Sequence, residues 1–231
     1  TGTPGSPGVA TGPARVVRGP GDFGRVRPGD VLVCRTTDPA WTPLFGVVAA
    51  GLATAKGGFG GIVTRERTKP IIAAVDGPAL AGGTEIVLSC DLVVASTTAT
   101  FGIPEVKRSL VAAAGGLFRL GRKIPFNIAM ELALTGDPIS AEVAHHHGLV
   151  NRLCEPGEAL DVATALAEQI CANAPVAVRE SRRVVLEATH APDEVGWKMS
   201  GEGMAAAMRS DDFREGLTAF IEKRKPEFHG R

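Results

Sequence analysis

Hydrophobic and polar positions follow two different patterns along this chain, and the change falls near residue 50. Before it, short apolar runs stand between glycines and prolines, and two of them, residues 14–17 and 30–34, are typical of short strands. Residues 1–50 bury too little apolar surface to be secure alone, so they should dock on the rest or stay partly disordered. We therefore expect a β-rich fragment over residues 1–50 and a second domain over residues 51–231.

From residue 51 the pattern is that of an α/β protein. Continuous apolar runs predict buried strands at 70–75 and 92–95, with a short strand at 100–102. Helical periodicity follows, and Ser140 is a candidate N-cap for one of these helices. The predicted helices cover residues 128–134, 141–146, 159–171, 176–188 and 211–225.

Composition narrows the class of protein. The 231 residues are 44% hydrophobic and 22% charged, and 25 Lys and Arg balance 25 Asp and Glu. A nucleic-acid partner is not expected, because such proteins carry a basic surplus. No apolar run approaches the roughly 20 residues of a membrane span, and the first residues lack the pattern of a signal peptide. We expect a cytoplasmic protein without a membrane partner.

Cysteine and histidine spacing gives no metal site. Four cysteines stand far apart and match no zinc or redox motif, which favours reduced thiols in the cytoplasm. Three consecutive histidines, 145–147, point in different directions on a helix, so a polar helix end is expected there and no metal.

A glycine-rich turn is the first candidate for chemistry. After the strand at 70–75, the segment 76–88 predicts a tight turn with Ala81, Gly82 and Gly83, followed by a helix. Free N–H groups at a helix N-terminus favour negative charge, and glycines let a ligand approach the backbone. Such a turn suits a phosphate or a developing oxyanion. Close packing of helix on strand remains an alternative on spacing alone.

Two glutamates accompany this turn. Glu85 lies one turn into the predicted helix, and Glu105 follows the short strand at 100–102. Both stand among apolar residues, where a carboxylate has a raised pKa and can act as a general acid or base. A helix-start charge or a loop-end salt bridge explains either glutamate alone.

Several motifs together resemble those of the enoyl-CoA hydratase/isomerase (crotonase) family, over about residues 51–231. They stand in the family's order and spacing. These are Ile-Ala-Ala-Val-Asp-Gly-Pro-Ala-Leu-Ala-Gly-Gly-Thr-Glu at 72–85, Cys-Asp-Leu-Val-Val-Ala at 90–95, Phe-Gly-Ile-Pro-Glu-Val at 101–106, Leu-Thr-Gly-Asp at 134–137, Gly-Leu-Val-Asn at 148–151 and Glu-Gly-Leu-Thr-Ala-Phe-Ile-Glu-Lys-Arg at 215–224. The resemblance implies a ββα core with a helical C-terminal trimerisation region.

The resemblance also implies a reaction. It places the Gly82 N–H on a thioester oxygen and assigns Glu85 and Glu105 to the addition of water across a 2-enoyl-CoA double bond. Two carboxylates favour hydration over the alternative, enoyl-CoA isomerisation. Ala81 and Gly83 would contact the substrate, and Phe220 and Lys223 would contact coenzyme A, which enters as part of the substrate with no separate cofactor. A homotrimer or homohexamer is expected.

Departures from the family pattern suggest a third alternative. The N-terminal region that supplies the first oxyanion N–H and much of the coenzyme A pocket has no counterpart here, and the stretch after Glu105 reads Ala-Ala-Ala-Gly-Gly at 112–116. Loss of one oxyanion donor costs about 10²–10³ in rate in other enzymes. A catalytically impaired remnant that serves as a binding or oligomer-forming protein is therefore an alternative to the hydratase.

Residues 1–50 resemble the start of the swivelling phosphohistidine domain of PEP-utilising enzymes. The motifs are Gly-Ser-Pro-Gly-Val-Ala-Thr-Gly at 5–12, Pro-Gly-Asp-Val-Leu-Val at 28–33 and Thr-Asp-Pro-Ala-Trp-Thr-Pro-Leu-Phe at 37–45. That domain carries phosphate on a histidine shortly downstream, but the first histidine here is His145. Phosphoryl transfer is therefore not expected.

Overall fold

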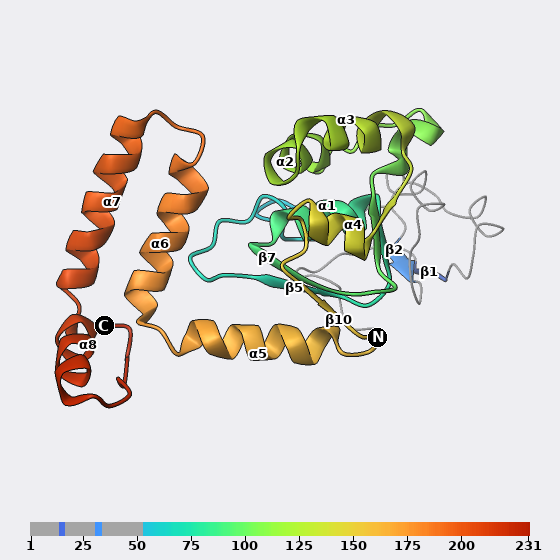
Figure 1. The fold of residues 1–231 in the computed structure, drawn as a ribbon. Helices are drawn as coiled ribbons and strands as arrows, with labels where there is room; N and C mark the ends of the chain where they lie inside the picture. The colour runs from blue at the N-terminus through green and yellow to red at the C-terminus, as the bar shows by residue number, and fades with distance from the viewer. Residues whose placement is uncertain (1–13, 17–30, 34–52) are drawn as a thin grey trace. The chain divides into compact units, whose positions relative to one another are not determined.

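The computed structural model describes residues 14–16, 31–33 and 53–231 (Figure 1). These fall into two compact units. The first takes the chain up to residue 66 together with residues 73–160, and the second joins 67–72 to 161–231. Most of the join expected near residue 50 lies outside the described residues.

Four short strands come early in the chain. β1 (Ala14–Val16) pairs in parallel with β2 (Val31–Val33), so the described residues of both strands expected in the N-terminal fragment are strands. β3 (Ala53–Thr54) and β4 (Gly58–Phe59) form an antiparallel pair.

A three-stranded sheet supports the first unit. Its order is β10 (Arg152–Cys154), β7 (Leu92–Ser96) and β5 (Ile72–Val75), and β10 runs parallel to β7. The four residues after Leu92 in β7 are buried, as their continuous apolar sequence predicts for a central strand. The strands expected at 70–75 and 92–95 are thus confirmed.

A second three-stranded sheet holds the segments that carry the glutamates. Its order is β6 (Pro78–Leu80), β8 (Thr100–Gly102) and β9 (Ile139–Ser140), with β6 parallel and β9 antiparallel to β8. The sequence predicted only a tight turn between the strand at 70–75 and the following helix, and β6 is an additional strand within that segment. Pro and Gly favour a turn locally, but the neighbouring strand β8 pairs with Pro78–Leu80 and makes it a strand.

Helices cover these sheets (Figure 1). α1 packs on β6 and α2, α3 packs on α2 and η3, and α4 packs on β8, β9 and β10. Large side chains from several elements, among them Phe101, Leu88 and Leu120, are fully buried in the core. The helical elements are α1 (Gly82–Ser89), the 3₁₀ helix η3 (Pro104–Arg108), α2 (Gly116–Lys123), α3 (Phe126–Thr135) and α4 (Ala141–His146).

The second unit is helical. Its helices are α5 (Ala159–Cys171), which starts at the end of the first unit, α6 (Pro175–Ala188), α7 (Asp193–Met208) and α8 (Asp211–Glu222). α6 and α7 pack along each other, and α8 contacts α7. The helix predicted over 211–225 ends earlier, because Lys223 adopts a left-handed conformation with φ 55°.

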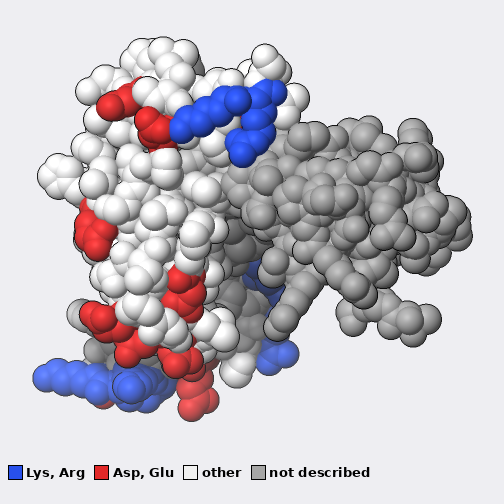
Figure 2. Space-filling view, turned by 90° about the vertical axis from the view of Figure 1, so that its right-hand side faces the viewer, with Lys and Arg blue, Asp and Glu red and all other residues white. Residues whose placement is uncertain are grey.

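The described surface carries both signs of charge. On the face shown in Figure 2, basic and acidic side chains are interspersed among uncharged ones. None of the helices in the described part of the chain combines the length and apolar character needed to cross a bilayer.

Candidate active site

One pocket of the first unit gathers the residues that the sequence singled out. It measures about 520 Å³, and Ala81, Gly82, Glu85 and Glu105 all contribute to its wall. The rest of the wall is largely apolar and comes from the β4 region, from the segment between η3 and α2, and from α2 itself. Its members include Phe59, Val63, Leu110, Val111, Ala113, Ala114 and Phe118. The pocket therefore places two carboxyl groups in apolar surroundings.

The start of α1 forms one side of the pocket. Gly82 is the first residue of α1, so its N–H is among those that have no acceptor within the helix. Ala81, just before it, has a φ of 52°, which residues with a side chain rarely adopt. The Ala81 N–H donates to the Gly102 carbonyl at 2.9 Å and anchors this turn to β8. The ring of Phe59 lies so close that a Cβ on Gly82 would meet it at 2.4 Å.

Glu85 is held by the start of another helix. Its side chain comes from α1, is only 4% exposed, and accepts a hydrogen bond from the Gly116 N–H at 2.9 Å through Oε1. Gly116 is the first residue of α2, whose N-terminal dipole favours a negative group. Burial raises the pKa of Glu85 above its ordinary value of 4.5 against the opposing effect of the Gly116 N–H, and the negative charge of Glu105 raises it further.

Glu105 lies in η3, and its carboxyl group is held less firmly than that of Glu85. It is 6% exposed, and its Oε2 atom is buried without a hydrogen-bond partner among the described residues. Burial raises the pKa of Glu105, while its own backbone N–H and the charge of Arg108 oppose the increase. A partnerless oxygen in a pocket wall is available to a ligand, since buried polar atoms otherwise find partners.

The other predicted contacts fall elsewhere. Gly83 is the second residue of α1 but is not among the residues that line the pocket. Phe220 and Lys223 belong to the second unit, where Phe220 is 83% exposed on α8 and Lys223 ends that helix. The pocket in the first unit therefore includes Ala81, Gly82, Glu85 and Glu105 but neither of the two predicted coenzyme A contacts.

Gly116 and Arg119 belong to the site although sequence analysis did not single them out. Gly116 fixes Glu85, and the Arg119 guanidinium lines the pocket and donates to the carbonyls of Val63 and Ala114. The signal for Gly116 was present, because Gly-Gly at 115–116 stands where the amphipathic run of α2 begins. The partner that such a helix start would bind is visible only in the fold.

The histidines and cysteines do not form a metal site in the described residues. No group of three His, Cys, Asp or Glu side chains there is placed to hold a metal ion. His145 lies near the end of α4, and its Nδ1 is 2.8 Å from the Val150 carbonyl. Among the described residues, Cys90, Cys154 and Cys171 are not joined in disulfide bonds.

The fold and the paired glutamates define a protein of the enoyl-CoA hydratase/isomerase class. The profile of that family matches residues 63–231, so the chain belongs to the enoyl-CoA hydratase/isomerase family. A second profile, that of the mobile domain of PEP-utilising enzymes, matches residues 26–92. Each of the two family resemblances found in the sequence is thus matched by a family profile. The two matched ranges overlap over residues 63–92.

Individual relatives support the assignment. An enoyl-CoA hydratase of Mycobacterium tuberculosis is 44% identical over 167 residues, which are 72% of this chain and 63% of that protein. A mevalonyl-coenzyme A hydratase of Aspergillus fumigatus is 42% identical over 181 residues, 74% of this chain and 64% of its own length. A crystal structure of an enoyl-CoA hydratase from Mycobacterium tuberculosis superposes with a TM-score of 0.75 at 45% identity, over 91% of this chain and 83% of that one.

The chain spans less than two thirds of the length of these two curated relatives.

Proposed function

We propose that the pocket hydrates a 2-enoyl-CoA thioester. The observation that carries this proposal is the pair of buried glutamates, both with a raised pKa, in one apolar pocket with the N-terminus of α1. Addition of water to a conjugated thioester needs a donor for the thioester oxygen, a base for the water and an acid for Cα. The pocket offers a group suited to each of these.

The surroundings of the Gly82 N–H, Glu85 and Glu105 assign each of them a different role in the reaction. The Gly82 N–H polarises the thioester oxygen, because Gly82 lines the pocket and is the first residue of α1. Glu85 is fixed by Gly116 through one oxygen, so its other oxygen orients water and takes its proton. Glu105, with a raised pKa and a partnerless oxygen, gives a proton to Cα. The new C–O bond forms at Cβ as the double bond opens, and proton exchange between the carboxyl groups restores the starting state.

The substrate class follows from the wall of the pocket. Its apolar side chains suit an acyl chain, and relatives of the chain carry hydratase names that specify coenzyme A thioesters. In this proposal coenzyme A enters with the substrate, no separate cofactor takes part, and Phe220 and Lys223 contact it. The proposed protein is a homotrimer or homohexamer in the cytoplasm and acts in acyl-CoA metabolism.

The oxyanion site is where this chain departs from the family pattern. The structure describes one candidate donor, the Gly82 N–H, while the residues directly before Ala53 lie outside the described part of the chain. We propose that turnover is reduced if no second donor takes the place of the family's first one, by on the order of 10²–10³. Isomerisation of a 3-enoyl-CoA is the alternative reaction, and the presence of two carboxylates favours hydration over it.

A single assay tests the proposal. Hydration of crotonyl-CoA is measured with the whole chain, and Glu105→Gln serves as the inactive variant. Glu131 is an exposed glutamate on α3, so Glu131→Gln is the matched control. We expect turnover that Glu105→Gln abolishes and Glu131→Gln preserves. Folded protein that binds crotonyl-CoA without turnover would contradict hydration and favour the impaired remnant. Turnover of a 3-enoyl-CoA alone would favour the isomerase.

A further inference from the structure

A buried threonine hydroxyl ties the two glutamate-bearing segments together. Thr84, which precedes Glu85 in α1, is 0% exposed. Its Oγ1 accepts a hydrogen bond from the Gly102 N–H at 3.0 Å and lies 2.9 Å from the Gly102 carbonyl. The Ala79 carbonyl is within hydrogen-bond distance as well, so the single hydroxyl proton has two acceptors available.

Gly102 is therefore bonded twice to the turn that starts α1. Its carbonyl accepts the Ala81 N–H at 2.9 Å, and its N–H donates to Thr84. The unusual φ of Ala81 lies between these two anchors, which is the arrangement expected where surrounding structure maintains a strained residue.

The same glycine leads to the second glutamate. Gly102 ends β8, and Glu105 follows three residues later in the first turn of η3. Gly102 also packs closely on Pro138, where a Cβ would meet the Cα at 3.0 Å, so it has little room to move. The Thr84–Gly102 contact thus joins the segment with Gly82 and Glu85 to the segment with Glu105.

We propose that Thr84 is a positioning residue that sets the separation of the two carboxyl groups and the direction of the Gly82 N–H. It touches neither the pocket nor the substrate, since it is absent from the residues that line the pocket. This inference rests on the proposed hydration. Misplacement of catalytic groups by about 1 Å can cost on the order of 10² in rate.

The test compares two substitutions of Thr84 with a matched control. Thr84→Val keeps the shape but removes the hydroxyl and leaves the buried Gly102 N–H without this acceptor, whereas Thr84→Ser keeps the hydroxyl. Ser96→Ala removes an equally buried hydroxyl that bonds the Asp76 carbonyl at 3.0 Å, outside the pocket. We expect Thr84→Val to lower kcat by about tenfold to a hundredfold with little change in KM. Thr84→Ser should restore most of the rate, and Ser96→Ala should leave it unchanged.

The pH profile separates positioning from simple stability. If Thr84→Val moves Glu85 relative to Gly116 and Glu105, it changes the surroundings that set the pKa of Glu85. The acid limb of the pH profile of kcat should therefore shift in Thr84→Val. It should stay in place in Ser96→Ala. Equal kcat and an unmoved profile in folded Thr84→Val would overturn the proposal. If that variant does not fold, Thr84→Cys, which places a weak hydrogen-bonding group at the same position, takes its place.

A measurement without turnover keeps this inference apart from the proposed function. Infrared titration of the carboxyl bands is performed on the free protein, with Glu85→Gln and Glu105→Gln to assign them. A shift of the titration in Thr84→Val but not in Ser96→Ala supports positioning even if no hydration is found. If the titration shifts but the protein does not turn over crotonyl-CoA, the proposed hydration is overturned and the positioning role of Thr84 is not. An unshifted titration overturns the role of Thr84.

Discussion

The Oε1 atom of Glu85 accepts a hydrogen bond from the N–H of Gly116 at 2.9 Å, and this bond joins two helices across 31 positions of sequence. It places a carboxyl group at the positive end of α2 while the pocket surrounds it with apolar side chains. The two influences oppose each other. Burial is the larger, so the pKa of Glu85 remains raised despite the N–H donor.

Substitution of Gly116 tests this relationship. A Cβ there would stand 3.0 Å from Cγ and 3.1 Å from Oε1 of Glu85. We expect Gly116→Ala to push the carboxyl group out of place and lower kcat by about tenfold to a hundredfold. Gly121→Ala, on the same helix with open space around it, is the control and should stabilise α2 by up to about 1 kcal/mol. Steady-state kinetics and thermal unfolding of both variants check the prediction, and unchanged kcat in Gly116→Ala would contradict it.

The raised pKa of Glu105 predicts that this residue, proposed for catalysis, lowers the stability of the fold at neutral pH. The unfolded chain loses the proton near 4.5, while the folded protein holds it to a higher pH because burial disfavours the charge. The stability that this proton provides is therefore complete below pH 4.5 and lost as pH rises through the folded pKa. Each pKa unit of the difference corresponds to about 1.4 kcal/mol.

Glu105→Gln should accordingly unfold at a higher temperature than the wild type at neutral pH and at the same temperature below pH 4.5. It should also lose hydration. Thermal unfolding across pH, with the exposed Glu131→Gln as the control, measures the difference. A lower Tm of Glu105→Gln at neutral pH would show that the carboxylate stabilises the fold and would falsify this account.

Gly82 is expected to tolerate no side chain. A Cβ would stand 2.4 Å from the Phe59 ring, so Gly82→Ala forces the ring out of its place in the pocket wall and moves the α1 N-terminus. We expect kcat to fall on the order of 10². Gly77→Ala, with nothing within 4 Å of its Cβ, serves as the control. Wild-type kinetics in Gly82→Ala would show that neither the place of the ring nor a shift of the α1 N-terminus affects the reaction.

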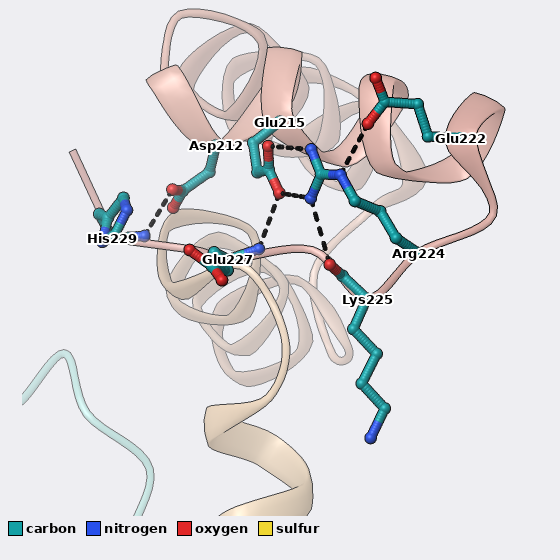
Figure 3. A network of polar contacts seen from close by, with 7 residues as sticks. All are labelled: Asp212, Glu215, Glu222, Arg224, Lys225, Glu227 and His229. Carbon is teal, nitrogen blue, oxygen red and sulfur yellow. Dashed lines mark hydrogen bonds and ion pairs between the residues drawn. The ribbon is translucent and has the colours of Figure 1, made fainter.

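A polar network in the second unit predicts a response to acid (Figure 3). Arg224 donates to both oxygens of Glu215, and Glu215 also accepts the Glu227 N–H at 2.8 Å. The hydrogen bond from Arg224 lowers the pKa of Glu215 to about 2 from 4.5. The network is therefore complete above pH 4.5 and is lost as pH falls towards 2.

Hydrogen exchange at the Glu227 amide measures this loss. Exchange should be slow above pH 4.5, after correction for its intrinsic pH dependence, and protection should be lost as pH falls towards the pKa of Glu215, about 2. Glu215→Gln should lose part of the protection at neutral pH. Glu222→Gln, which keeps the bidentate Arg224–Glu215 pair, should retain it. Equal protection in both variants and the wild type would show that Glu215 does not hold the C-terminal segment.

Local patterns in the sequence were sufficient for elements with local causes. α4 and α5 have the predicted bounds, 141–146 and 159–171, and the Ser140 side chain caps α4 by accepting the Val143 N–H. The raised pKa values of Glu85 and Glu105 were also predicted, because both stand among apolar neighbours in the sequence. The described residues do not test their catalytic roles, which remain predictions.

Elements that depend on packing against another element were missed. β6 looked like a turn until β8 paired with it, and α2 and α7 were not predicted at all. α7 contains three glycines within the helix, which weaken its helical signal, and it packs along α6. The distant strand β8 decides β6, whereas α7 packs along α6, the helix that directly precedes it in the sequence.

The sequence by itself determined the family, the α/β class and the two glutamates, because short motifs of defined spacing carry that information. Only the tertiary structure decided that Gly116 anchors Glu85, that Phe59 covers Gly82, and that Thr84 joins the start of α1 to the strand that leads to Glu105. The physical reason is that hydrogen bonds and steric contacts depend on distances within a few ångströms. Sequence spacing does not specify such distances between segments that meet only when the chain folds.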